Sequence, residues 1–383
     1  MKTWIYLIIL TVVVASCSSG RKALQKGDYI QAIEKAVNRL SNDPDNKKAE
    51  NVLTDGYPVA MDYYQEQIDQ ILSGNDQFKW GQTLGIMQRV NHLGEVIRRV
   101  PAARKLVPSP KMYTSEIADV TNRAAEERYQ AGLASLARPN RDDAREAFFN
   151  FQTADHLVPS YKDVLEKMDV AKDRATLKVI IEPIPLPSKR YALSADFFYN
   201  EVINKMDQQF PANGFVNFYS PDEADKQKIR HPDMVVRLEF YDFYVGKPNH
   251  FETQQKLDRV VEKEVKVKVG RDSVRIEKRP QKFHGKIKIA TDEVKSGGLL
   301  TVTIEDFQAQ KILINENVPG EFTWQNQYGL FVGDEEVLTD QQIQILNNKA
   351  VPPPAPQDMF IEFTRPIFAQ LTDRLTAYFN RYK

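Results

Sequence analysis

The spacing of apolar positions changes once along the chain, between residues 172 and 176. Before this point, apolar residues recur every three or four positions, which is the period of a helix with one buried face. One such stripe consists of Trp80, Leu84, Met87, Val90, Ile97 and Val100. After this point, short runs with a period of two become common, as in residues 262–269, where charged and apolar residues alternate as in a strand with one solvated face. The pattern predicts a helical half followed by a half that contains a sheet.

The second domain, residues 176–383, is expected to be an α+β sandwich with a mainly antiparallel sheet. A helix with Ser194 as its N-cap follows the first strand, a proline-rich spacer occupies 351–356, and a closing helix spans 364–382 with Pro366 in its first turn. The expected strands are 177–184, 215–219, 234–245, 262–269, 274–277, 285–290, 299–304 and 311–315.

Two segments of the first domain resemble the tetratricopeptide repeat. In the first segment, residues 27–29 form the turn before a helix that carries the small residue Ala32 and ends near Pro44. The second has small, aromatic, small and proline residues at matching positions, namely Ala147, Phe151, Ala154 and Pro159. The resemblance implies about three all-α helical hairpins stacked side by side, a form that often offers a concave face to a partner. A degenerate helical bundle produces the same pattern, so that alternative stays open.

The first sixteen residues have the pattern of an export signal. Lys2 supplies a positive charge, and Ile5–Ala15 is an apolar stretch of eleven residues, which is shorter than the roughly 20 residues that span a bilayer. Residues 14–17, Val-Ala-Ser-Cys, then resemble the lipobox of bacterial lipoproteins, in which the cysteine receives a diacylglyceryl group and the signal is cut before it. The resemblance implies a signal peptide at 1–16 and a helical domain, residues 17–172, that starts at a lipid anchor on Cys17. An ordinary secretory signal with a chance cysteine is the alternative.

Cys17 is the only cysteine of the chain, so it has no internal disulfide partner, and lipidation accounts for it. Ser18 and Ser19 follow it. By resemblance to the sorting rules of proteobacterial lipoproteins, the absence of Asp there favours the outer membrane. The absence of any acidic residue disfavours export to the cell surface. We therefore expect a protein held in the outer membrane by its lipid anchor and facing the periplasm.

The C-terminal half resembles envelope lipoproteins such as the curli secretion channel subunit and the penicillin-binding-protein activators. The resemblance rests on the opening strand at 179–181, the helix around Val202, and the run 300–306 followed by 311–313. It is a likeness in the order of elements over about 200 residues. It implies an accessory role in an outer-membrane assembly, secretion or cell-wall machine, with protein partners in the envelope.

The sequence shows no arrangement typical of catalysis, a cofactor or a metal. No two of the five histidines are closer than 19 residues, and a nucleophile elbow, a phosphate-binding loop and a dinucleotide fingerprint are all missing. The acid pairs at 126–127 and 335–336 are adjacent, so their side chains point apart. We expect a protein that is not an enzyme and that needs no cofactor or metal.

Charge singles out one region. The chain has 52 basic and 52 acidic residues, which argues against general nucleic-acid binding. Residues 255–288, however, hold twelve basic and five acidic residues, a net charge of +7. The candidate contact residues are Lys263, Lys266, Lys268, Arg271, Arg275, Lys278 and Arg279. They predict a basic hairpin that meets an acidic partner, an anionic glycan or a lipid head group. Alternatively, these residues are the solvated face of an edge hairpin that resists aggregation.

Our first hypothesis from the sequence is a non-enzymatic envelope lipoprotein that serves as a scaffold or accessory subunit. The alternative is a lipoprotein that binds a glycan at the cell surface. An enzyme of an unrecognised type is a third hypothesis.

Overall fold

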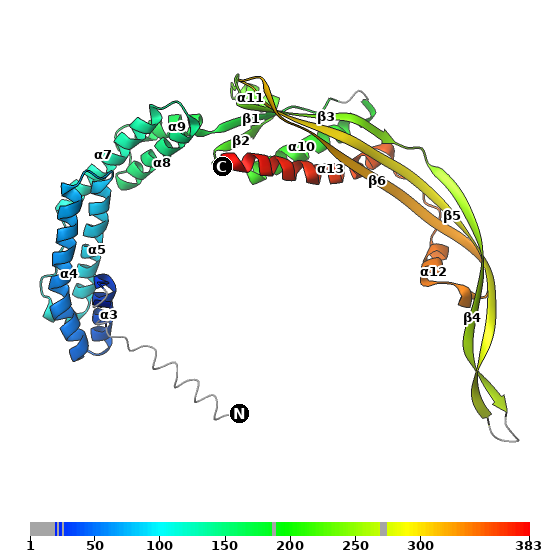
Figure 1. Cartoon of the computed structure of the whole chain (residues 1–383), viewed down its shortest axis with the longest axis horizontal. Coiled ribbons are helices and arrows are strands. Elements are labelled where there is room, and N and C mark those ends of the chain that lie inside the picture. Colours follow the sequence, from blue (N-terminus) through cyan, green and yellow to red (C-terminus); the bar gives the residue numbers. More distant parts are fainter. Residues whose placement is uncertain (1–19, 21–22, 25–26, 186–188, 269–273) are drawn as a thin grey trace. The chain divides into compact units, whose positions relative to one another are not determined.

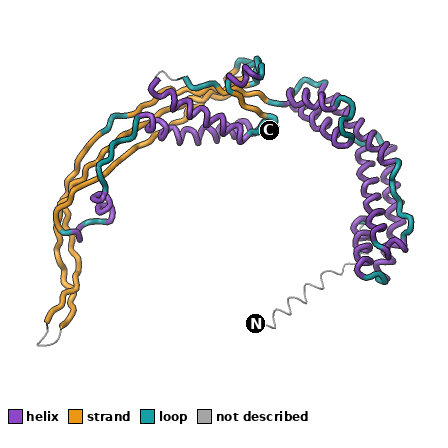
Figure 2. Tube along the Cα trace, turned by 180° about the vertical axis from the view of Figure 1, so that it is seen from behind, coloured by secondary structure: helices purple, strands orange, loops and turns teal. Residues whose placement is uncertain are grey.

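The computed structural model describes residues 20, 23–24, 27–185, 189–268 and 274–383. The chain divides into two compact units, Met1–Ala175 and Thr176–Lys383. The regular structure described in the first unit is helical, whereas the second unit contains a sheet with helices packed against it (Figure 1, Figure 2). The predicted fold class, a helical half followed by an α+β half with a mainly antiparallel sheet, is confirmed. Among the described residues, no helix is both long and apolar enough to cross a membrane.

Neighbouring helices of the first unit pack against one another. Three of them begin after a residue whose side-chain oxygen accepts a hydrogen bond from the backbone of the first turn: Asp28, Asn46 and Asn140. The helices are α3 (Tyr29–Asn42), α4 (Lys47–Ser73), α5 (Lys79–Arg99), α6 (Pro101–Leu106), α7 (Glu116–Leu136), α8 (Arg141–Leu157) and α9 (Val164–Ala175).

Two apolar clusters stabilise this unit. The larger cluster contains residues of all the helices from α3 through α7. The smaller cluster contains residues of α7, α8 and α9 around Phe151. A Cβ atom at Gly132 would lie 2.6 Å from Cε1 of Phe151, so α7 and α8 approach closely at this point. The residues Ala32, Ala147, Phe151 and Ala154, on which the repeat resemblance rests, are all buried. Burial of these positions is common to helical repeats and to bundles, so the tetratricopeptide character stays a prediction.

The second unit is built on one six-stranded sheet, with strand order β2-β1-β3-β5-β4 and with β6 on the other edge of β5. β1 is parallel to β2 and to β3, and the remaining pairs are antiparallel. β4 pairs with the first part of β5, and β3 pairs with the last part of β5. Strands β4 and β3 therefore lie one after the other along the same edge of β5. The strands are β1 (Leu177–Ile181), β2 (Val216–Tyr219), β3 (Met234–Val245), β4 (Asn249–Lys268), β5 (Val274–Asp306) and β6 (Lys311–Gly333).

Three of these strands are much longer than the sequence pattern predicts. β5 is a single strand of 33 residues where three separate strands were expected, β4 starts at Asn249 rather than at 262, and β6 continues to Gly333 rather than ending at 315. Polar stretches and glycines interrupt the alternation, but the backbone ladder continues through them. At Gly298, for example, a Cβ atom would lie 2.8 Å from the Phe363 ring, so the glycine makes room for a helix.

Two helix starts also differ from the predictions. Helix α10 (Ala192–Gln209) begins before Ser194, which is therefore a buried residue inside the helix and not its N-cap. The closing helix α13 (Pro356–Phe379), predicted at 364–382, starts eight residues earlier and continues in a 3-10 turn at Asn380–Tyr382. Pro356, which the sequence placed in the spacer, is the first residue of α13, where a missing N–H costs nothing. Pro366 consequently lies inside the helix.

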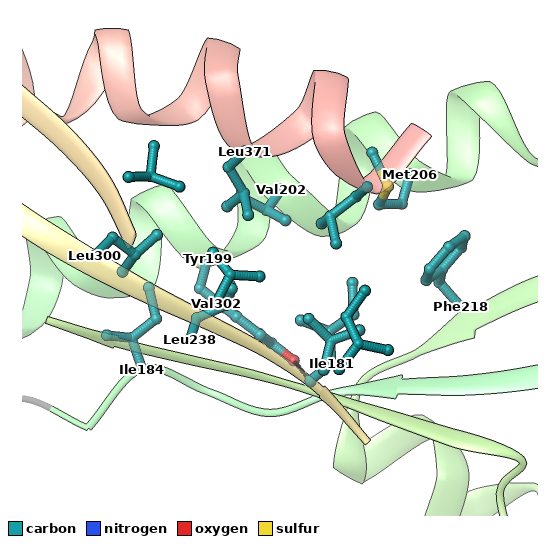
Figure 3. Packing of buried hydrophobic residues seen from close by; sticks show 14 of the residues in the cluster. Ile181, Ile184, Tyr199, Val202, Met206, Phe218, Leu238, Leu300, Val302 and Leu371 are labelled. Atoms are coloured by element: carbon teal, nitrogen blue, oxygen red, sulfur yellow. Dashed lines mark hydrogen bonds between the residues drawn. The ribbon is translucent and has the colours of Figure 1, made fainter. Parts of the chain in front are cut away.

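Helices α10 and α13 cover one face of the sheet and form the main core with it. Figure 3 shows Val202 and Met206 from α10 and Leu371 from α13, directed toward the strand residues Leu300 and Val302. The Tyr199 hydroxyl, also on α10, donates a hydrogen bond of 2.8 Å to the carbonyl oxygen of Ile181 (Figure 3). Each fully buried aliphatic or aromatic side chain contributes roughly 1.5–3 kcal/mol. This core holds the part of the sheet from which the long strands extend.

Candidate functional site

The long strands form an arm that extends beyond the helix-covered core of the second unit. We define the arm as residues 249–293 of β4 and β5 together with residues 325–333 of β6. Figure 1 and Figure 2 both show this ribbon running away from α10 and α13. β4 alone has 20 residues, which corresponds to about 65 Å of strand. Past Gly333, β5 pairs only with β4, so the outer part of the arm is a two-stranded ribbon.

One face of the arm is braced by the segment that follows β6. This brace, residues 334–347, consists of a 3-10 turn at Glu335–Val337 and helix α12 (Asp340–Asn347). Its Val337 and Leu338 form a small buried cluster with Phe283 and Ile287 of β5. Polar contacts at the same place come from Asp334, whose carboxylate accepts from the His284 N–H at 3.0 Å, and from Glu336, which accepts from Lys263 at 2.5 Å.

The opposite face of the arm is not covered by any segment that the structure describes. Phe283, Gly285 and Ile287 contact the brace or β6, and because strand residues alternate between faces, the even-numbered residues of β5 lie on the other side. We call this side the open face: the even-numbered residues of 256–266 and 276–288, with Leu330 and Val332. Leu330 is 73% and Val332 is 77% exposed, and Val260 and Ile276 are about as exposed at 60% and 59%.

The open face is rich in lysine. It carries six lysines, Lys256, Lys266, Lys278, Lys282, Lys286 and Lys288, and three carboxylates, Asp258, Glu262 and Glu264. Lys288 pairs with Glu252 at 2.7 Å, and Asp258 pairs with His284. The other five lysines form no ion pair with a residue that the structure describes. Lys256 and Lys286 lie directly opposite each other in the ladder, an arrangement of like charges that destabilises a strand pair.

The structure divides the predicted contact residues between the two faces of the arm. Lys263 and Arg279 are cross-strand partners on the braced face; Lys263 pairs with Glu336, and Arg279 pairs with Glu277 at 3.1 Å. Arg275 is exposed on the same side, whereas Lys266 and Lys278 belong to the open face. Arg271 and the Lys268 side chain lie outside the described residues, as does Cys17.

The sequence pattern missed several residues of this site. It did not identify Leu330 and Val332 of the open face, or Val337 and Leu338 of the brace. The alternation of residues 328–333 carried a signal for a strand, because Leu330 and Val332 share one side and Phe331 the other. The brace gave no comparable signal, since its two buried residues are adjacent.

Two hollows on the core of the second unit are further candidates. One, of about 360 Å³, is an apolar groove between α10 and α13 that Phe197 and Phe368 help to line. The other, of about 380 Å³, lies at the edge strand β2 and combines the rings of Phe210, Phe218 and Tyr219 with the polar groups of Asp207, Asn217, Glu223 and Gln227. Burial, followed by the nearby Glu223 carboxylate, raises the pKa of Asp207. The Asn217 Oδ1 atom is buried and accepts no hydrogen bond from the described residues.

The acidic pairs singled out in the sequence make separate contacts. Glu126 accepts a hydrogen bond of 2.5 Å from Lys162, whereas Glu127 accepts one of 2.9 Å from the Trp80 N–H. Within the described ranges, no group of three or more His, Cys, Asp or Glu side chains is placed to hold a metal ion.

Comparisons with known proteins do not define a family. Neither a protein-family model nor a curated protein matches the chain. One solved structure that matches is described as a homologue of a neuraminyllactose-binding hemagglutinin from Helicobacter pylori. It is 10% identical, its alignment covers 54% of this chain and 90% of that chain, and the TM-score is 0.26. A TM-score this low carries no argument about fold or function.

Proposed function

We propose that this chain is a non-enzymatic lipoprotein of the bacterial cell envelope, anchored through Cys17 on the periplasmic side of the outer membrane. It acts there as a scaffold or accessory subunit of an outer-membrane assembly, secretion or cell-wall machine. The observation that carries the proposal is the arm, because its ribbon presents an open face that no described residue of its own unit covers. Exposed apolar residues grouped with charged ones are typical of surfaces that contact other macromolecules.

The anchor part of the proposal depends on the sequence around Cys17. Each buried CH₂ of an acyl chain contributes roughly 0.8 kcal/mol, so two or three chains hold a protein at a membrane without a spanning helix. A helical unit and a long arm on such an anchor suit a protein that brings partners together at the membrane.

Membrane fractionation tests the anchor. The Cys17→Ser variant should leave the membrane fraction, whereas the matched Ser18→Ala variant should remain in it. If Cys17→Ser stays with the membrane, the lipoprotein proposal is wrong.

Purification from solubilised envelopes tests the scaffold role. We expect the wild-type chain to retain stoichiometric envelope proteins that a variant with Leu330→Asp and Val332→Asp on the open face loses. Leu165→Asp, on the exposed side of α9 and 52% exposed, is a comparison for a nonspecific loss of exposed apolar surface. Recovery of the wild-type chain without any envelope protein would count against the scaffold role.

The pocket at β2 favours a second candidate function, binding of a glycan at the cell surface. Its three aromatic rings and four polar side chains are the kind of lining that orients a polar ligand. An Asp207→Ala variant should lose any stabilisation by added oligosaccharides in a thermal shift assay, and Asp222→Ala serves as a nearby control. Digestion of the protein by protease added to intact cells would favour this candidate, and protection would favour the periplasmic scaffold.

A further inference from the structure

The open face of the arm carries an excess of positive charge, with six lysines against three carboxylates. Five of its lysines have no ion pair with a described residue, and they alternate with Val260, Ile276, Leu330 and Val332. The rungs from Ile276 to Lys288 span about 40 Å. A partner for this face needs carboxylates spread along one direction, with some apolar surface among them.

Helix α4 of the first unit has these properties. After Lys47 and Lys48 in its first turn, α4 contains five acidic residues and no further lysine or arginine. Asp55, Asp62, Glu66 and Asp69 are all exposed and, at about 100° per residue, fall within one narrow arc of the helix. Val59, 51% exposed, lies in the same arc, and Tyr63, 39% exposed, lies beside it. We call this the acidic face of α4.

The acidic face is also without ionic partners. The Asp69 carboxylate accepts from Gln65 at 2.9 Å and that of Glu66 from Gln70 at 3.1 Å, while Asp55 and Asp62 make no ion pair with a described residue. Like charges three or four positions apart cost a helix roughly 0.2–0.5 kcal/mol per pair. Asp62, Glu66 and Asp69 therefore oppose one another, just as Lys256 and Lys286 do on the arm. A contact between the two faces would relieve both repulsions.

We propose that copies of this chain associate with each other, the open face of the arm of one copy docking on the acidic face of α4 of another. The four carboxylates of the acidic face span about 20 Å, so the longer open face can cover them. Val59 and Tyr63 then meet the exposed aliphatic residues of the arm. The proposal deepens the scaffold function and rests on it only for the role of the arm as a contact surface.

An anionic membrane is a less suitable partner for this face. The open face has three carboxylates of its own among its lysines, and its exposed apolar residues are aliphatic, whereas Trp and Tyr are the side chains enriched at membrane interfaces. Carboxylates among lysines suit a protein surface of mixed charge.

Charge reversal on each face tests the proposal. The arm variant carries Lys256→Glu, Lys266→Glu and Lys286→Glu, and the helix variant carries Asp62→Lys, Glu66→Lys and Asp69→Lys. The full chains are purified in a non-ionic detergent, and self-association is measured by sedimentation velocity at low and high salt. All six positions are exposed, and circular dichroism checks that the variants fold.

We expect the wild-type chain to self-associate at low salt and to dissociate at high salt, where screening is strong. Each variant alone should associate at least roughly tenfold more weakly, because like charges then meet across the contact. An equimolar mixture of the two variants should associate again, since the acidic arm of one faces the basic helix of the other. Lys226→Glu with Lys228→Glu, two exposed positions outside both faces, controls for charge change alone.

Several results would overturn the proposal. A monomeric wild-type chain at low salt is one, and an arm variant that fails to associate while the helix variant behaves as wild type is another. In another such result, a chain that carries both sets of substitutions regains the contact while the mixture of the two single-face variants does not. That result would place the contact within one chain. Association that requires anionic phospholipid vesicles would assign the arm to lipid. A monomeric chain that still retains envelope partners would leave the scaffold function standing.

Discussion

The Nζ atom of Lys263 lies 2.5 Å from Oε1 of Glu336 and 4.6 Å from the centre of the Phe283 ring. The ion pair connects the two-stranded part of the arm to the brace, and the contact with Phe283 lies within the arm. Both charged side chains are well exposed, at 44% and 40%, so their ion pair is a weak source of stability. Most of the stability of the contact between arm and brace must therefore come from the buried apolar residues Ile287, Val337 and Leu338. This distinction can be tested because the two faces of the arm differ so strongly in burial.

We predict that Ile287→Ala loosens the arm without unfolding the rest of the chain. Ile287 is completely buried, and truncation of such a residue costs about 2–5 kcal/mol. Amides of β4 and of the first half of β5 should exchange with solvent at least roughly thirtyfold faster. Amides of β1 and β3, in the main core, should keep their protection. Hydrogen exchange with mass spectrometry measures both.

Val332→Ala is the matched control, because Val332 lies beside the same stretch of β5 but is 77% exposed on the open face. Its effect should be within about 0.5 kcal/mol. Equal effects of the two substitutions would show that the brace does not stabilise the arm.

We predict that Gly320→Ala destabilises the second unit. A Cβ atom at this position would lie 2.4 Å from the carbonyl oxygen of Phe363 and 2.5 Å from Cγ1 of Ile367, so α13 would have to move away from β6. Overpacking of this kind costs about 1–3 kcal/mol, measurable by urea unfolding. The same substitution at Gly85 of α5, where a Cβ would meet no atom within 4 Å, should instead stabilise by up to about 1 kcal/mol. An unchanged midpoint for Gly320→Ala would contradict the close packing of α13 on β6.

The sequence predicted best those elements whose burial follows a single period. Met234–Val245 was placed correctly as a strand, and the helix expected around Val202 is α10, whose buried stripe includes Phe198, Val202 and Met206. The start of α13 was predicted too late because its first buried residues, Met359, Phe360 and Phe363, come soon after the proline-rich segment 351–356.

The length and continuity of the arm escaped prediction because strands that are solvated on both sides need no apolar alternation. Over residues 274–282, Ile276 is 59% exposed and the ladder alone maintains the strand. The face on which each lysine lies depends on which residues pair across β4 and β5, and no local pattern specifies that register. The sequence therefore predicted that the seven basic contact residues lie on a hairpin. It did not predict that the described ones among them divide between the two faces of that hairpin.

Acid is expected to weaken the packing around Glu126. Hydrogen bonds from Lys162, then from Tyr161 and Gln130, lower the pKa of Glu126 to about 2. Because the folded pKa lies below the ordinary 4.5, the stabilisation is complete above about pH 4.5 and is lost as the pH falls toward 2. Glu126 is 38% exposed, so solvent screening limits the effect to about 1 kcal/mol.

Glu126→Gln should therefore weaken the packing of α7 against the loop before α9 near pH 6 and have a clearly smaller effect near pH 2.5. Urea unfolding of the full chain at both pH values, followed by the protection of α7 amides, measures the difference. Glu166→Gln, a nearby exposed carboxylate without a described partner, should change little at either pH. A cost of Glu126→Gln that is the same at both pH values would mean that the charge on Glu126 does not hold this loop. The amide would then differ from the carboxylate only in shape and hydrogen bonding, and the contacts of Tyr161 and Lys162 would stabilise the unit without the ion pair.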